Sequence, residues 1–181
     1  MVWVQPYSFS SKDKRTKKQV TEALIMSTID FCIEIWGENS DVQHRVQVAL
    51  NGVLREYLGY KDRQDAHVKD LLEEAGWLNV PNRWRQALIK AMDRIMEHKF
   101  PEPIWNLIET TPVHRYETRN TDLKIHWTPR NETVSKAMFW QAKTIINETK
   151  YNQMTVEGMS KADHRDFIKR MLIGHYGNTN C

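Results

Sequence analysis

The chain has 181 residues, of which 40% are hydrophobic and 27% charged, and its formal net charge is +3. These values are ordinary for a soluble globular protein, and the length suffices for one domain with a sizeable core. Seven glycines are few for this length, which argues against a β-sandwich or barrel with its many tight turns.

Residues 1–15 are predicted to form an extended, basic arm. The start of the chain lacks the apolar run of a signal peptide, and no stretch approaches the roughly 18 apolar residues of a membrane span. We therefore expect no membrane contact and a cytoplasmic, reducing location. The two cysteines indicate neither a disulfide framework nor a zinc site, and Cys32, in an apolar run, is predicted to be a buried free thiol.

Apolar residues at helical spacing predict a mainly α (α+β) domain of about seven helices over residues 16–173. The first helix, at about 16–36, is apolar on nearly all sides after its first turn. Such a helix is buried in a core or an oligomer interface, so we expect a homo-oligomer. The second helix opens with a capping box at Ser40 and Gln43 and ends at Gly59.

A third helix at about 65–75 and a fourth at about 81–98 are joined by a tight turn at Gly76. A closely joined pair whose second helix begins with basic residues is typical of a helix-turn-helix. The same pattern fits an ordinary helical hairpin, and both interpretations stay open. A short helix is expected at 103–109.

The pattern then alternates, and residues 113–128 are predicted to form one small β-hairpin. Helices are expected to resume at about 132–148 and 161–173. Residues 174–181 carry few apolar side chains and are predicted to be a mobile tail.

The polar run from Asp163 to Asp166 contains His164 and Arg165 and resembles fragments of metal-dependent nucleases and phosphohydrolases. On a helix, however, neighbouring residues point about 100° apart, so these side chains cannot converge on one ion. We interpret the run as a helix start with Ser160 as the N-cap.

A helix pair followed by a hairpin is the order of a winged helix-turn-helix, in which the second helix enters the major groove. We therefore hypothesise a non-enzymatic nucleic-acid-binding accessory protein, which requires cations from three segments to gather on one side. The candidate contacts are Lys14, Arg15, Lys17 and Lys18 in the arm, Asn82, Arg83, Arg85, Gln86 and Lys90 on the fourth helix, and Arg119 and Lys124 in the hairpin.

Two other classes stay open. One is a protein–protein adaptor or inhibitor that uses partly exposed tryptophans as anchors. The other is a small hydrolase or nucleotide-processing enzyme in which His114 and His126 bind a metal or shuttle a proton. No carboxylate or thiol at ligand spacing accompanies these histidines, and no glycine-rich phosphate loop occurs, so no metal or cofactor is expected. The candidate anchors are Trp3, Trp77, Trp84, Trp105 and Trp140.

Overall fold

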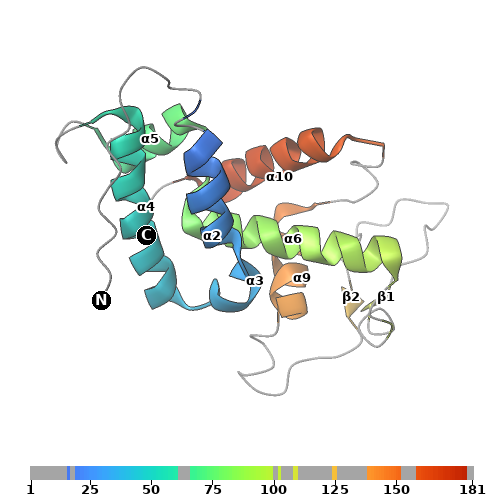
Figure 1. Cartoon of the computed structure of the whole chain (residues 1–181). Helices are drawn as coiled ribbons and strands as arrows, with labels where there is room; N and C mark the ends of the chain where they lie inside the picture. Colours follow the sequence, from blue (N-terminus) through green and yellow to red (C-terminus); the bar gives the residue numbers. More distant parts are fainter. Residues whose placement is uncertain are drawn as a thin grey trace.

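The helical class is confirmed by the structure, a computed structural model that describes residues 16, 19–60, 66–99, 102, 108–109, 124–125, 138–151 and 158–178. These residues form one π-helical turn, seven α-helices and two short strands (Figure 1). The bounds are Thr21–Met26 (π-helix), Ser27–Asp30 (α2), Ile33–Trp36 (α3), Ser40–Leu58 (α4), Val68–Ala75 (α5), Val80–His98 (α6), Ile108–Glu109 (β1), Lys124–Ile125 (β2), Met138–Thr149 (α9) and Lys161–Tyr176 (α10).

The first predicted helix is interrupted between α2 and α3. Phe31 is extended there, and Cys32 is left-handed with a φ of 52°. The indole N–H of Trp36 donates to the carbonyl oxygen of Phe31 at 2.9 Å and so satisfies a group that the break leaves without a helical partner. Cys32 is exposed at this break, and the prediction of a buried thiol is wrong.

Helices α4, α5 and α6 follow their predicted courses because their end signals are local. The N-cap of α4 is Asn39 rather than Ser40, and its side-chain oxygen accepts from two backbone amides of the first turn. Gly59 and Gly76 end α4 and α5 with φ angles of 87° and 68°, a conformation that favours glycine. Asn79 caps α6.

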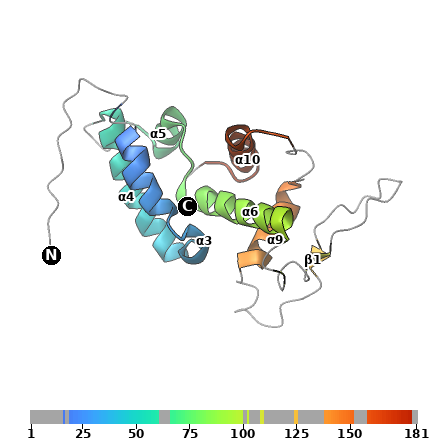
Figure 2. The same cartoon turned by 45° about the vertical axis from the view of Figure 1, so that its right-hand side comes forward.

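Helix α6 lies at the centre of the fold and contacts α2, α3, α4, α9 and α10 (Figures 1 and 2). Two apolar cores meet along it, and each fully buried aliphatic side chain contributes about 1.5–3 kcal/mol to stability. One core, shared with α9 and α10, contains Leu88, Ile89, Met92, Ile145, Ile168 and Leu172; the other, shared with α4 and α5, contains Leu50, Leu54, Leu72, Trp77 and Val80.

The C-terminal residues that the structure describes are fixed to the domain, unlike the mobile tail predicted for 174–181. Helix α10 continues to Tyr176, and Asn178 is only 2% exposed. The side-chain oxygen of Asn178 accepts from the backbone N–H of Asn79 at 2.9 Å, and its amide donates to the carbonyl oxygen of Trp77 at 3.0 Å. These bonds close the turn between α5 and α6. The last three residues lie outside the described part.

The β-hairpin predicted over 113–128 is not seen among the described residues. Instead, β2 pairs in antiparallel fashion with β1, which lies before the predicted hairpin. The centre of the predicted turn, 119–122, holds no glycine for the positive φ angles of a tight two-residue turn, so the local signal was weak. Of the helix expected at 103–109, the last two residues form β1, and the others lie outside the described residues.

Candidate nucleic-acid interface

Asn82, a predicted contact residue, lies in the core with no exposed surface. Its backbone N–H donates to the side-chain oxygen of Asn79 at 2.9 Å, and its side-chain amide donates to the carbonyl oxygen of Gly177 at 2.6 Å. A side chain without exposed surface cannot reach a base edge. The structure therefore gives Asn82 a structural role in place of the predicted contact.

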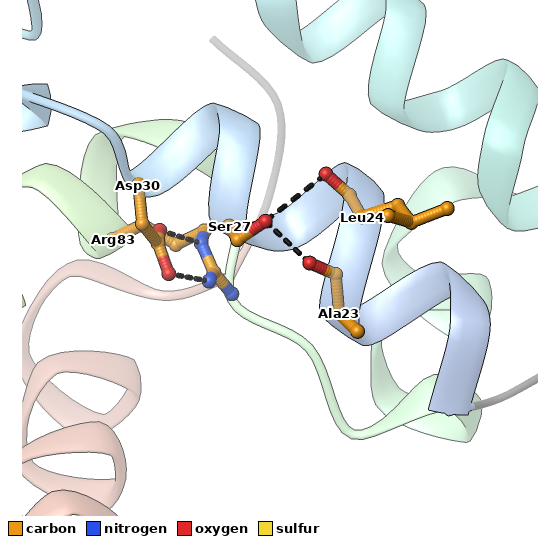
Figure 3. A network of polar contacts seen from close by, with 5 residues as sticks. All are labelled: Ala23, Leu24, Ser27, Asp30 and Arg83. Atoms are coloured by element: carbon orange, nitrogen blue, oxygen red, sulfur yellow. Dashed lines mark hydrogen bonds and ion pairs between the residues drawn. The ribbon is translucent and has the colours of Figure 1, made fainter.

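Arg83 forms an ion pair that joins α6 to α2. Two nitrogens of its guanidinium donate to the two carboxylate oxygens of Asp30 at 2.9 and 2.6 Å (Figure 3). In the same view, the hydroxyl of Ser27 donates to the carbonyl oxygens of Ala23 and Leu24 and holds the turn that leads to Asp30. A guanidinium paired in this way has fewer donors left for a base or a phosphate.

Arg85 and Gln86 both face α10. The guanidinium of Arg85 lies 4.0 Å from the ring centroid of Tyr176 and donates to the side-chain oxygen of Asn82 at 2.9 Å. The side-chain amide of Gln86 donates to the backbone carbonyl oxygen of Arg165 at 3.1 Å. The first turns of α6 are therefore packed against the C-terminal helix.

The central position of α6 bears directly on the helix-turn-helix interpretation. A recognition helix needs a free face along its first turns to enter a major groove about 12 Å wide. Helix α6 is instead contacted by five other helices. The α5–α6 pair is thus the ordinary helical hairpin that the sequence left open, and the described residues do not form the winged geometry.

Positive charge converges beside the middle of α6. The pKa of Lys90 is lowered, first by burial and then by Arg165 on α10; Arg83 and Arg94 act in the same direction, whereas Asp30 raises it. Three neighbouring cations therefore act on the half-buried ammonium of Lys90. We call Lys90, Arg94 and Arg165 the cation cluster.

The cation cluster is accessible and, among the described residues, incompletely neutralised. Arg94 is exposed, and the side chain of Arg165 is 61% exposed. The nearest carboxylate oxygen of Asp166 lies 3.9 Å from the guanidinium of Arg165, which is a weak surface pair. The carboxylate of Asp30 is shared with Arg83. An anion at this surface would relieve the remaining repulsion.

A partly buried polar group joins Asp93 of α6 to Tyr151 and to His164 of α10. The hydroxyl of Tyr151 donates to a carboxylate oxygen of Asp93 at 2.7 Å, and Nε2 of His164 lies 2.7 Å from that hydroxyl and 3.3 Å from the same carboxylate. Burial raises the pKa of Asp93, although the bond from Tyr151 and the charge of His164 oppose this rise. Burial and Asp93 together raise the pKa of Tyr151, which stays a neutral donor near pH 7.

Sequence reasoning did not assign Arg94, His164 or Arg165 to a site. It did place the last two at a helix start, and the predicted cap is confirmed because the hydroxyl of Ser160 accepts from the backbone N–H of Asp163 at 3.2 Å. The signal that was missed is the meeting of this helix start with the middle of α6, which no local pattern encodes.

The remaining predicted contacts are not brought to the cluster by any described contact. Lys124 belongs to β2, of which only the backbone is described. The other predicted residues of the arm and hairpin, and the histidines and two of the tryptophans of the alternative hypotheses, lie outside the described residues: Lys14, Arg15, Lys17, Lys18, Arg119, His114, His126, Trp3 and Trp105.

Tryptophans expected as anchors take part in internal packing. Trp77 is buried and stacks on Tyr57 with ring centroids 5.2 Å apart. Trp84 packs against the core of α6, α9 and α10, and its indole N–H is buried. Trp140 is half-buried, with the ammonium of Lys143 4.3 Å from its ring centroid. Trp77 and Trp84 therefore stabilise the fold.

Among the described residues, the three most exposed large apolar side chains lie instead on the N-terminal helical segment. Leu24, Phe31 and Ile35 are 64%, 75% and 77% exposed. We call these three residues the apolar patch. An open hollow beside it is lined by Ile35, Trp36 and Val42, among other residues. Exposed side chains of this size mark an interaction surface when they gather.

Within the described ranges, no three His, Cys, Asp or Glu side chains are grouped so that they could hold a metal ion. None of the helices found there has the length and apolar character needed to cross a membrane. No protein-family model, curated protein or solved structure matches the chain.

Proposed function

We propose that this protein is a non-enzymatic nucleic-acid-binding protein that contacts the phosphate backbone through Lys90, Arg94 and Arg165. The observation that carries the proposal is the position of the half-buried Lys90 one turn before the exposed Arg94 on α6, with Arg165 of α10 held against the same helix by the bond from Gln86 to its carbonyl oxygen. Burial lowers the pKa of Lys90 first, and the charges of Arg165, Arg83 and Arg94 add to this effect, whereas Asp30 opposes it. Binding in this mode reads no base edges and needs no recognition helix, because phosphate contacts position a protein without specifying sequence.

The chemistry of the cluster suits phosphates. The exposed guanidiniums of Arg94 and Arg165 can each donate two parallel hydrogen bonds to a phosphate, while Lys90 supplies a point charge from a less solvated position. A bound phosphate reduces the repulsion between these cations, and this reduction contributes favourably to the free energy of binding. The cations predicted in the arm and hairpin would extend the surface.

Fluorescence anisotropy with a labelled 20-mer, as duplex and as single strand, tests the proposal. Three phosphate contacts predict that log K falls with log salt with a slope of about −2 to −3. Replacing both exposed arginines (Arg94→Ala, Arg165→Ala) should weaken binding uniformly across sequences and reduce the magnitude of the slope by about 2.

The matched control is Arg45→Ala, which removes an exposed arginine from α4 that does not act on Lys90. This variant should bind as the parent protein does. Absence of binding at low salt, or an equal loss in the control and the double variant, would refute the assignment.

For the apolar patch we propose a second copy of this chain as the partner, in keeping with the homo-oligomer expected from the sequence. Phe31 is exposed, and its carbonyl oxygen accepts a hydrogen bond from Trp36, which lines the hollow together with Ile35 and Val42, so a knob and a recess lie close together. A two-fold axis would pair each knob with the recess of the other copy. A cytoplasmic location would keep the neighbouring exposed thiol of Cys32 reduced.

Light scattering after size exclusion tests this partner. The parent protein should show twice the 21.5 kDa mass of one chain at micromolar concentration, and Phe31→Ser with Ile35→Ser should return it to one chain. Val48→Ser, which removes an exposed apolar side chain from α4, is the control. A monomeric parent protein would contradict this proposal and direct attention to an adaptor role.

A further inference from the structure

The hollow beside the apolar patch carries two carboxylates as well as apolar groups. It encloses about 610 Å³, which is enough for several side chains, and its apolar lining is Ile35, Trp36 and Val42. Glu38 and Asp41 line it too, and none of the described residues around it is a lysine or an arginine. We call Glu38 and Asp41 the acidic pair.

The acidic pair is open to a cation. Asp41 is exposed and Glu38 is half-buried, and neither carboxylate forms an ion pair with another described residue. The adjoining end of α4 has little to offer an anion, because the side-chain oxygen of Asn39 already accepts from the N–H groups of Asp41 and Val42 at 3.0 and 3.1 Å. A partner of this hollow therefore needs positive and apolar groups together.

The helical segment that carries the apolar patch is acidic along its length. From position 19 to 44 the sequence contains no lysine or arginine, and Arg45, the next cation along the chain, does not line the hollow. If a second copy contacted the patch with this segment alone, acidic side chains would face acidic side chains, and like charges across an interface oppose binding. The second copy must therefore supply cations from another part of its chain. The acidic residues of the segment are Glu22, Asp30, Glu34, Glu38 and Asp41.

The arm predicted at residues 1–15 has the required composition. Its cations Lys12, Lys14 and Arg15 are opposed only by Asp13, and aromatic side chains precede them at positions 3, 7 and 9. The arm comes shortly before the helical segment that carries the patch. Fifteen extended residues reach up to about 50 Å, so the arm is long enough to cross from one copy to the other.

We propose that the arm of each copy binds in the hollow of the other copy, beside the Phe31 knob of its own copy. The aromatic side chains of the arm extend the apolar contact, and its cations neutralise the acidic pair. Opposite charges placed in this way favour the correct pairing of the two surfaces. The inference rests on the second copy proposed for the apolar patch and names the segment that completes this interface. Phosphates and the acidic pair would compete for Lys14 and Arg15.

Reversal of charge on either side tests the exchange of arms. The hollow variant is Glu38→Lys with Asp41→Lys, and the arm variant is Lys12→Glu with Lys14→Glu. Each variant alone brings like charges together, so sedimentation equilibrium at about 50 mM salt should show a dissociation constant of the dimer that is raised at least about tenfold. An equimolar mixture of the two variants should dimerise about as tightly as the parent protein, because each arm then meets a hollow of opposite charge.

A matched control makes the same change of charge elsewhere. Asp70→Lys with Glu97→Lys, at exposed positions on α5 and α6, should leave the dimer unchanged. Far-UV circular dichroism should show the helix content of the parent protein in every variant. If Asp41→Lys, in the first turn of α4, reduces the helix content, Glu38→Lys alone takes its place in the experiment.

The outcomes separate this inference from the proposal on which it rests. A dimer that neither variant weakens overturns the exchange of arms and leaves the second copy standing. A weakened dimer that mixing does not restore also overturns the exchange, as it would if each arm bound its own copy. A monomeric parent protein overturns the second copy itself, and this inference with it.

Discussion

Replacement of Asn178 by alanine tests whether the C-terminal residues are part of the domain. Its side chain makes hydrogen bonds to two buried backbone groups, the N–H of Asn79 at 2.9 Å and the carbonyl of Trp77 at 3.0 Å. A buried group left without its partner costs about 1–3 kcal/mol. The side-chain entropy no longer lost on folding offsets part of this cost, so we expect Asn178→Ala to lower the free energy of unfolding by about 2–4 kcal/mol.

Urea denaturation followed by far-UV circular dichroism measures the change, and the melting temperature should fall by about 5–15 °C. Gly174→Ala, in the last turn of α10 shortly before Asn178, is the matched control. A Cβ at Gly174 meets no atom within 4 Å, so this substitution should leave stability unchanged or raise it by up to about 1 kcal/mol. If Asn178→Ala lies within about 0.5 kcal/mol of the parent protein, which is the usual scatter for a surface substitution, the segment is not fixed as described.

Three further substitutions test the core and the charged groups. The raised pKa of Asp93 means that the folded protein binds the carboxyl proton more tightly than the unfolded chain does. The free energy of unfolding should therefore fall by up to about 1.4 kcal/mol per pH unit as the pH rises above about 4. Denaturation between about pH 4 and 7 should show a smaller fall in Asp93→Asn than in the parent protein. Lys90→Met should raise the free energy of unfolding by about 1 kcal/mol or less, because burial and the neighbouring cations disfavour the charge of Lys90. The same substitution should weaken DNA binding. If the variant and the parent protein are equally stable in urea, this cause is contradicted. A Cβ at Gly37 would overlap the indole of Trp84, so Gly37→Ala should cost about 1–3 kcal/mol in a thermal melt, and an unchanged melting temperature would count against that packing.

Helix boundaries were predictable wherever one short signal decided them. Gly59 and Gly76 end their helices in the left-handed conformation that glycine favours, and Ser160 caps α10 as expected. These features depend on a few neighbouring residues, which the sequence displays directly.

The features that were missed depend on contacts between distant residues. Asp30 and Arg83 are 53 positions apart, and their ion pair turns a predicted DNA contact into a link between helices. The break at Cys32 was missed because the apolar pattern continues across it. The periodicity of apolar residues also could not show that other helices surround α6, so its basic residues were predicted to be accessible to nucleic acid. The cation cluster forms only where α6 and α10 pack together, and no local sequence pattern predicts that contact.

The bonds made by Asn178 also constrain the order in which the chain can fold. Residues 77–82 are translated early, yet the backbone N–H of Asn79, the side-chain amide of Asn82 and the carbonyl oxygen of Trp77 find these partners only in residues that follow 95 to 101 positions later. During synthesis the turn between α5 and α6 must therefore stay solvated or be held by other partners. These hydrogen bonds join residues that are far apart in the sequence, so we expect them to form late and to slow the final step of folding.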